Sequence, residues 1–161
     1  MSRIIFGHIV NHREPKGTHY VLEAVHNARM KGLDFGFILG ERLPHEQAMK
    51  LYEYVDVLLE QFVIGWYGAQ AVEFMAMGKA VVAYLHPDDL KKVDPQMAKD
   101  LPIINASPLT LEDTLMNIVT GAIDLMEPFR MGPIFVKRWH DPKKIAAGLV
   151  KDYKSIMKGN K

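Results

Sequence analysis

Five short, mostly apolar runs constrain the fold of this chain more than any other feature. They are residues 4–6, 35–39, 55–59, 80–84 and 102–105. Runs that lack polar alternation are typical of strands buried on both faces, as in a parallel sheet covered by helices on each side. Segments with helical spacing separate the runs, which indicates the same layered arrangement. We therefore predict an α/β fold built on a doubly wound parallel sheet.

Capping residues and prolines suggest where the helices begin and end. Thr18 is a good N-cap for the first long helix, and Gly32 can end it. Two prolines interrupt the helical pattern of residues 126–133, so this stretch is expected to connect two helices and could also expose a docking surface. Further helices are expected over residues 44–54, 68–77 and 143–158.

The composition is that of one ordinary globular domain, which we expect to span residues 1–161. The apolar share is 48% and the net charge is +1, so no overall field favours nucleic acid. The absence of cysteine excludes disulfides and thiolate metal sites. The apolar runs are too short to cross a bilayer, and no secretory leader pattern is present, so a cytoplasmic location is the expectation.

A basic loop follows the first predicted strand. It contains Arg13, Lys16 and Gly17 directly before a helix. In an open parallel sheet, ligands bind beyond the carboxyl ends of the strands, and a helix N-terminus favours an anion. Two cations and a flexible backbone at such a place would suit a phosphate or diphosphate. The alternative is a solvated loop in which the two cations have no ligand.

A second loop, rich in glycine and aromatic residues, follows the third predicted strand. Gly68 would let a ligand approach the backbone amides at the start of a helix. Glu73 lies about a turn and a half into that helix among apolar residues. A carboxylate in such surroundings needs hydrogen-bond donors, which sugar or ribose hydroxyls could supply. The alternatives are that Glu73 caps a neighbouring loop or points outward.

Four segments together resemble the donor domain of family 4 retaining glycosyltransferases. Residues 16–24 are similar to their KG-x-x-x-L-x-E-A opening, and residues 56–57 to their A-D-V element. Residues 68–81 resemble the F-G-x-x-x-x-E-A-M-A-x-G-x-P-V signature, and residues 139–142 a stretch before the last helix. The resemblance implies the Rossmann-like C-terminal domain of a GT-B enzyme, which binds a nucleoside-diphosphate sugar as donor substrate and needs no other cofactor.

The resemblance also implies roles for the two loops. Arg13 and Lys16 would neutralise the donor diphosphate, amides at the start of the later helix would receive a phosphate, and Glu73 would hold the ribose hydroxyls. Residues 40–45 would cradle the base. No catalytic side chain can be assigned. The expected site residues are Arg13, Lys16, Gly17, Gly68, Ala69 and Glu73, with His12 and Tyr67 as accessories.

Two departures from the family pattern bear on activity. Gly65 stands where the family usually has a second glutamate that contacts the donor sugar. The acceptor domain of GT-B enzymes has no counterpart here, so we expect this chain alone to be inactive and to need that domain or a separate partner chain. The alternatives are a non-catalytic nucleotide-sugar-binding module and, more remotely, another Rossmann-like protein such as an epimerase.

Seven histidines and a basic C-terminal segment raise two further possibilities. The spacing of His8, His12, His19 and His26 completes no metal site, so no metal is expected. The helix predicted over residues 143–158 has one apolar face opposite its lysines. Packing of that face on the domain is the favoured interpretation. A membrane surface or another domain is the alternative.

Overall fold

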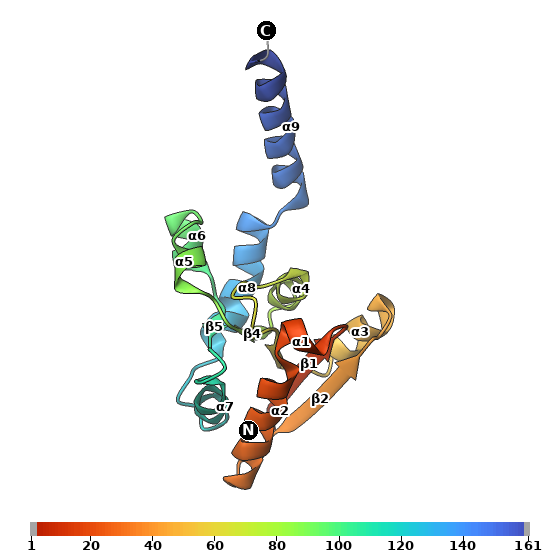
Figure 1. Cartoon of the computed structure of the whole chain (residues 1–161), viewed down its shortest axis with the longest axis vertical. Coiled ribbons are helices and arrows are strands. Elements are labelled where there is room, and N and C mark those ends of the chain that lie inside the picture. Colours follow the sequence, from red (N-terminus) through yellow and green to blue (C-terminus); the bar gives the residue numbers. More distant parts are fainter. Residues whose placement is uncertain (1–2, 160–161) are drawn as a thin grey trace.

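The sheet has five strands, all parallel, in the spatial order β2-β1-β3-β4-β5. The computed structural model describes residues 3–159 (Figure 1). The predicted α/β, doubly wound class is therefore confirmed, with strands that differ from the predicted runs by a few residues at their ends. The strands are β1 (Ile5–Val10), β2 (Gly36–Glu41), β3 (Val57–Leu59), β4 (Ala80–Ala83) and β5 (Ile104–Asn105).

Helices cover both faces of the sheet. Alternate strand residues point to opposite faces, so Val57 and Leu59 of β3 pack in the cluster that includes α2 and α7, whereas Leu58 packs in the cluster that includes α3, α4 and α8. The helices are α1 (Arg13–Lys16), α2 (Thr18–Met30), α3 (His45–Tyr52), α4 (Ala69–Ala76), α5 (Pro87–Leu90), α6 (Pro95–Asp100), α7 (Leu111–Val119), α8 (Met126–Trp139) and α9 (Pro142–Gly159).

The direction of winding reverses between β1 and β3. From β1 the chain moves outward to β2 at the sheet edge, and it then returns to pair β3 with the other side of β1. Loops that leave the carboxyl ends of β1 and β3 consequently diverge and leave a crevice between them. Both loops selected from the sequence start at this reversal point.

Two local predictions were wrong. Thr18 is not the N-cap of α2: Gly17 occupies that position in a left-handed conformation, with φ of 71°, and Thr18 is the first helical residue. Residues 126–133 are not a connector but belong to the continuous helix α8. Pro128 lies in its first turn, where a backbone N–H has no intrahelical acceptor, and only Pro133 removes a bond from its interior.

Helix α8 crosses α4 at a glycine. Gly132 is buried, and a Cβ atom at this position would lie 2.6 Å from the carbonyl oxygen of Met75. The absence of a side chain thus lets the two helix backbones approach closely. This crossing anchors α8, and through it α4, which supplies one wall of the crevice.

We predict that Gly132→Ala destabilises the protein although alanine is the better helix former. The added methyl group must displace the backbone of α4, which should lower the free energy of unfolding by about 1–3 kcal/mol. Gly148→Ala in α9 is the matched control: its Cβ would meet nothing within 4 Å, so it should raise helix stability by up to about 1 kcal/mol. Urea unfolding of both variants checks this, and equal shifts would contradict the close crossing.

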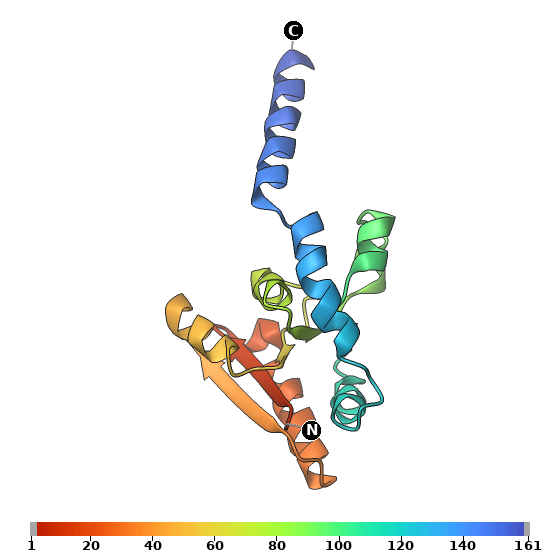
Figure 2. The same cartoon turned by 180° about the vertical axis from the view of Figure 1, so that it is seen from behind.

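The C-terminal helix α9 stands apart from the rest of the molecule. Both views show it extending beyond the end of α8 with no other element beside it (Figures 1 and 2). Every residue from Pro142 to Lys158 is exposed. The expectation that its apolar face packs on the domain is therefore wrong, because the short segment after Trp139 directs the helix away from the sheet.

Candidate functional site

The two selected loops meet at a cavity of about 430 Å³ beside the carboxyl ends of β1 and β2. The loop after β1 contributes one wall, the start of α4 a second, and α3 with the residues before it the third. The structure thus brings together four of the predicted site residues. The lining residues are Ile9, Val10, Asn11, His12, Pro15, Lys16, Leu43, His45, Ala48, Tyr52, Ala69, Gln70 and Glu73.

Lys16 is held at this cavity by a buried carboxylate that sequence reasoning missed. The Nζ atom of Lys16 donates to Oε1 of Glu60, and the two form an ion pair. The Glu60 side chain is fully buried, whereas the Lys16 side chain is 25% exposed. The second carboxylate oxygen accepts a hydrogen bond from the Gly68 amide at 3.4 Å. Glu60 therefore links the β1 loop to the N-terminus of α4.

The loop after β3 has a backbone conformation at Gly65 that disfavours a side chain, and its one carboxylate is that of Glu60. Gly65 has a φ of 84°, and a Cβ there would lie 2.9 Å from Cβ of His86, so a glutamate would be strained at this position. Glu60 comes five residues earlier, at the carboxyl end of β3. A charged residue directly after a fully apolar strand was the signal available in the sequence.

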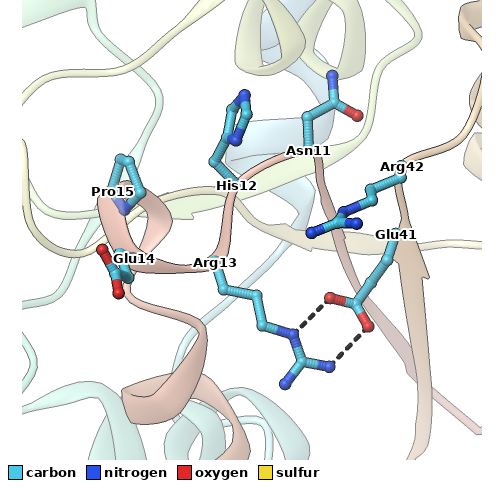
Figure 3. A pocket seen from close by; sticks show the side chains of 7 residues that line it. All are labelled: Asn11, His12, Arg13, Glu14, Pro15, Glu41 and Arg42. Carbon is cyan, nitrogen blue, oxygen red and sulfur yellow. Dashed lines mark hydrogen bonds and ion pairs between the residues drawn. The ribbon is translucent and has the colours of Figure 1, made fainter.

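Arg13 forms a second ion pair, on the outer side of the same loop. Its Nε and one terminal nitrogen donate to the two carboxylate oxygens of Glu41 at 2.5 and 2.6 Å. This bond to Arg13 holds the pKa of Glu41 below its usual value. The pair lines an open hollow of about 670 Å³ together with Arg42 and His12, and the His12 ring points away from the pair (Figure 3).

Glu73 projects from the middle of α4 into the first cavity. Its side chain is 33% exposed, and one carboxylate oxygen lies 3.7 Å from Nε2 of His45. Tyr52 and Gln70, which also line the cavity, are joined by a hydrogen bond of 3.1 Å between the amide nitrogen and the phenol oxygen. Glu73 thus faces the cavity with acceptor capacity that His45 does not fill.

Three predicted site residues have other contacts in the structure. Gly17 is buried between α1 and α2, and its amide donates to the Glu14 carbonyl at 3.0 Å. Tyr67 points toward α8, with its hydroxyl 2.9 Å from Nε2 of His140, and burial raises its pKa to about 12. Gly68 lies at the N-cap of α4, where a Cβ would come within 3.1 Å of the Glu60 carboxylate. None of these three lines the cavity, although Gly17 and Gly68 are the chain neighbours of Lys16 and Ala69, which do.

A buried histidine in β1 makes hydrogen bonds on both sides of the basic loop. His8 of β1 is fully buried, with Nδ1 2.6 Å from the Leu59 carbonyl and Nε2 2.9 Å from Oγ1 of Thr18. Burial lowers its pKa to about 4, so the ring is neutral at neutral pH. It donates to the carbonyl from one nitrogen and accepts the Thr18 hydroxyl proton at the other. His8 thereby ties β1 to β3 and to the start of α2.

The described part of the chain contains no group of three or more His, Asp or Glu side chains arranged to hold a metal ion. The positive groups at the crevice are therefore side chains and the N-terminus of α4. Its first N–H groups have no intrahelical acceptor. This arrangement can hold one anion between Lys16 and the amides of α4, with a carboxylate acceptor a turn and a half further along that helix.

Comparison with known proteins identifies the fold. No family model matches this sequence, and no curated protein does. Among solved structures, the chain is similar to the C-terminal domain of LpcC, a group 1 family glycosyl transferase from Francisella tularensis. The TM-score is 0.60 at 20% identity, over 86% of this chain and 87% of that one. The chain has the fold of a glycosyltransferase C-terminal domain.

The predicted resemblance to a GT-B donor domain is thereby confirmed at the level of the fold. In this fold both selected loops start at the crevice where the strand order reverses. The residue assignments themselves remain predictions. The geometry adds Glu60 and Glu41 to the candidate site residues. Lys16, predicted to bind the diphosphate, is paired with Glu60, and Arg13, predicted to do the same, is paired with Glu41.

We predict that His8 makes stability fall as the pH decreases from 6.5 toward 4. In this window the unfolded chain protonates at His8 while the native state does not, so the unfolded state binds more protons. The shift corresponds to a total loss of about 3 kcal/mol. Urea unfolding across this range should show a smaller loss for His8→Asn, which does not titrate there. An unchanged pH dependence in the variant would contradict the neutral, buried ring.

We also predict that Lys16→Met lowers the free energy of unfolding by about 3 kcal/mol, because it leaves the buried Glu60 carboxylate without its cation. The double variant Lys16→Met/Glu60→Gln should recover most of that loss. Arg13→Met is the matched control, since its pair with Glu41 is exposed and contributes little. Chemical denaturation compares the three, and equal losses for the two single variants would exclude a structural role for the buried pair.

Proposed function

We propose that this chain binds a nucleoside-diphosphate sugar as the donor half of a glycosyltransferase. The observation that carries the proposal is the cavity at the reversal of the strand order, where Lys16, the start of α4 and Glu73 converge. A cation, a helix N-terminus and a carboxylate match, in this order, a diphosphate followed by a hydroxylated sugar. The fold shared with a glycosyltransferase C-terminal domain supports the same assignment.

The diphosphate would lie between Lys16 and the first amides of α4. An ammonium group has three donors, and Glu60 uses one of them, so Lys16 keeps two for phosphate oxygens. Ala69 and Gln70, both at the cavity, belong to the first turn of α4 and add backbone donors. Arg13 uses two of the five N–H donors of a guanidinium in its pair with Glu41, a partly exposed and therefore weak partner, so it keeps donors for the diphosphate.

Glu73 would accept hydrogen bonds from the ribose hydroxyls. It lies far enough along α4 to leave the first turn of the helix free for a phosphate, and it faces the same cavity as Lys16. His45, the first residue of α3, lies 3.7 Å from one carboxylate oxygen of Glu73 and so borders the Glu73 side chain. The neighbouring residues before α3 would then contact the base.

Catalysis would rest on stabilisation of the departing diphosphate. In glycosyl transfer the bond between the sugar and the diphosphate breaks, and negative charge develops on the phosphate oxygens. A fixed cation and aligned amides stabilise that charge without reorganisation. The acceptor would be held by an N-terminal domain or a separate partner chain, so transfer would require both parts.

A non-catalytic binding module is the second candidate. Two observations favour it: Gly65 replaces the carboxylate expected near the donor sugar, and Glu60 neutralises Lys16 within the chain. A module of this kind would keep nucleotide binding while lacking turnover. An assay of sugar transfer in the presence of an acceptor domain separates the two candidates. A donor domain would then transfer sugar, and a binding module would not.

We predict that calorimetric titration with UDP, GDP and ADP detects binding of one nucleotide. Glu73→Gln should weaken it about 10- to 100-fold, which corresponds to the loss of a charge-assisted hydrogen bond. Lys16→Met/Glu60→Gln should weaken it at least as much, since it removes the cation without leaving a buried charge behind. Melting temperatures of both variants establish that they are folded.

Exposed positions away from the cavity provide controls for this titration. Lys137→Met and Glu127→Gln change the same kinds of charge at exposed positions of α8 that do not line the cavity, and should leave affinity unchanged. A folded chain that binds none of the three nucleotides would contradict the proposed site. Binding that is insensitive to both cavity variants would place the nucleotide elsewhere on the molecule.

A further inference from the structure

Strand β2 has an open outer edge. It is the last strand on its side of the sheet, and within residues 3–159 no element pairs with its outer side. Both views show β2 with nothing alongside it except β1 (Figures 1 and 2). The backbone groups on such an edge must find partners in water or in another chain.

The pairing of β2 with β1 determines which backbone groups point outward. The amides of Gly36 and Arg42, at the two ends of the strand, donate to the neighbouring chain segment at 2.8 and 2.9 Å. In a parallel ladder every second residue makes its hydrogen bonds to the same neighbour. The N–H and C=O groups of the intervening residues therefore point away from the sheet. These residues are Phe37, Leu39 and Glu41.

Strand β2 lacks the features by which edge strands usually avoid pairing. It is six residues long, it contains neither proline nor lysine, and its one charged residue is Glu41 at the end. The opposite edge strand, β5, has only two residues and closely follows Pro102. Phe37, Ile38 and Leu39 are half-buried, so part of each apolar side chain remains in contact with solvent. β2 thus combines free hydrogen-bonding groups with accessible apolar surface.

We propose that two copies of this chain pair through β2, in antiparallel orientation, about a two-fold axis at Ile38. The sequence is nearly symmetric about this residue, with Phe37 and Leu39 beside it and Gly36 and Gly40 beyond them. Each Phe37 then exchanges two backbone hydrogen bonds with Leu39 of the second copy. Because the groups involved are those that point outward, one continuous sheet forms across both copies.

The same register brings apolar side chains together on both faces of the joined sheet. Ile38, which packs toward α3, comes opposite Ile38 of the second copy. Phe37, which packs toward α2, comes beside Leu39 of the second copy on the other face. Cross-strand pairs of this kind stabilise antiparallel sheets. Gly36 and Gly40 also face each other, so no side chain obstructs the approach at these positions.

Opposite charges near the two ends of β2 favour a second copy over an unrelated strand. Asp34 comes four residues before Ile38 and Arg42 four residues after it, so each Asp34 lies opposite Arg42 of the other copy. Both side chains are exposed. Asp34 pairs with Arg3 of its own chain, but its side chain is 81% exposed and can accept a second cation. An unrelated strand could use the same backbone groups without matching the charge at both ends.

The test is sedimentation velocity of the full chain over a series of concentrations. The parent is expected to convert from monomer to dimer as the concentration rises. Leu39→Lys should raise the dissociation constant about tenfold or more, because it places two like charges beside the axis. Leu109→Lys is the matched control, since it adds the same charge at a side chain that is 94% exposed, and it should associate like the parent. Melting temperatures establish that both variants are folded.

Charge reversal and hydrogen exchange test the register. Arg42→Asp and Asp34→Arg should each weaken the dimer about tenfold, because like charges then lie opposite at both ends, and the double variant should recover most of the loss. By NMR, the amides of Phe37 and Leu39 should exchange rapidly in the monomer and slowly in the dimer. The amide of Gly36, which is bonded within the chain, should exchange slowly in both.

Four outcomes would overturn the proposal, and none of them depends on nucleotide binding. A folded parent that stays monomeric at the highest concentration removes the dimer itself. A dimer that Leu39→Lys leaves intact, or in which the outward amides still exchange rapidly, is held together at another surface. A double charge reversal that is no tighter than the single ones contradicts the register at Ile38.

Discussion

The site depends on the two hydrogen bonds of one buried histidine. His8 joins the Leu59 carbonyl at the end of β3 to the Thr18 hydroxyl at the start of α2, at the place where the strand order reverses. Both bonds need the neutral ring, because an imidazolium has no acceptor nitrogen for Thr18. The histidine thus helps to fix the separation of the two loops that diverge here, and the Phe62 amide, which donates to the Lys16 carbonyl at 3.2 Å, joins the same loops directly. Lys16 and Glu60, one from each loop, meet beside these contacts.

The pairing of cations with carboxylates shapes what this crevice can bind. Lys16 and Arg13 each face an acid, so neither contributes a full charge to the field in the crevice. The two pairs are not equivalent, however: Glu60 is buried and has no water to replace its cation, whereas Glu41 is accessible. Lys16 is consequently held by a buried partner, whereas the partner of Arg13 is open to solvent. A ligand that contacts the amides of α4 as well as Lys16 gains more here than a free anion would.

The sequence was sufficient for the fold and for the neighbourhood of the site, because these follow from local patterns. Apolar runs indicated the parallel strands, and their loops indicated the carboxyl edge where Lys16 and Glu73 face one cavity. The partners of the cations were not predictable in the same way. Glu41 and Glu60 come from other strands, and only the strand order brings them to Arg13 and Lys16.

The remaining errors also have tertiary causes. Prolines at positions 128 and 133 suggested a break, but the close contact of Gly132 with α4 stabilises α8 as one helix. Thr18 suggested a cap, but His8 uses its hydroxyl. The amphipathic pattern of residues 143–158 indicated a helix with one apolar face, and the structure has that helix. The pattern contained no information on the direction of the helix, which the segment at His140 and Asp141 determines.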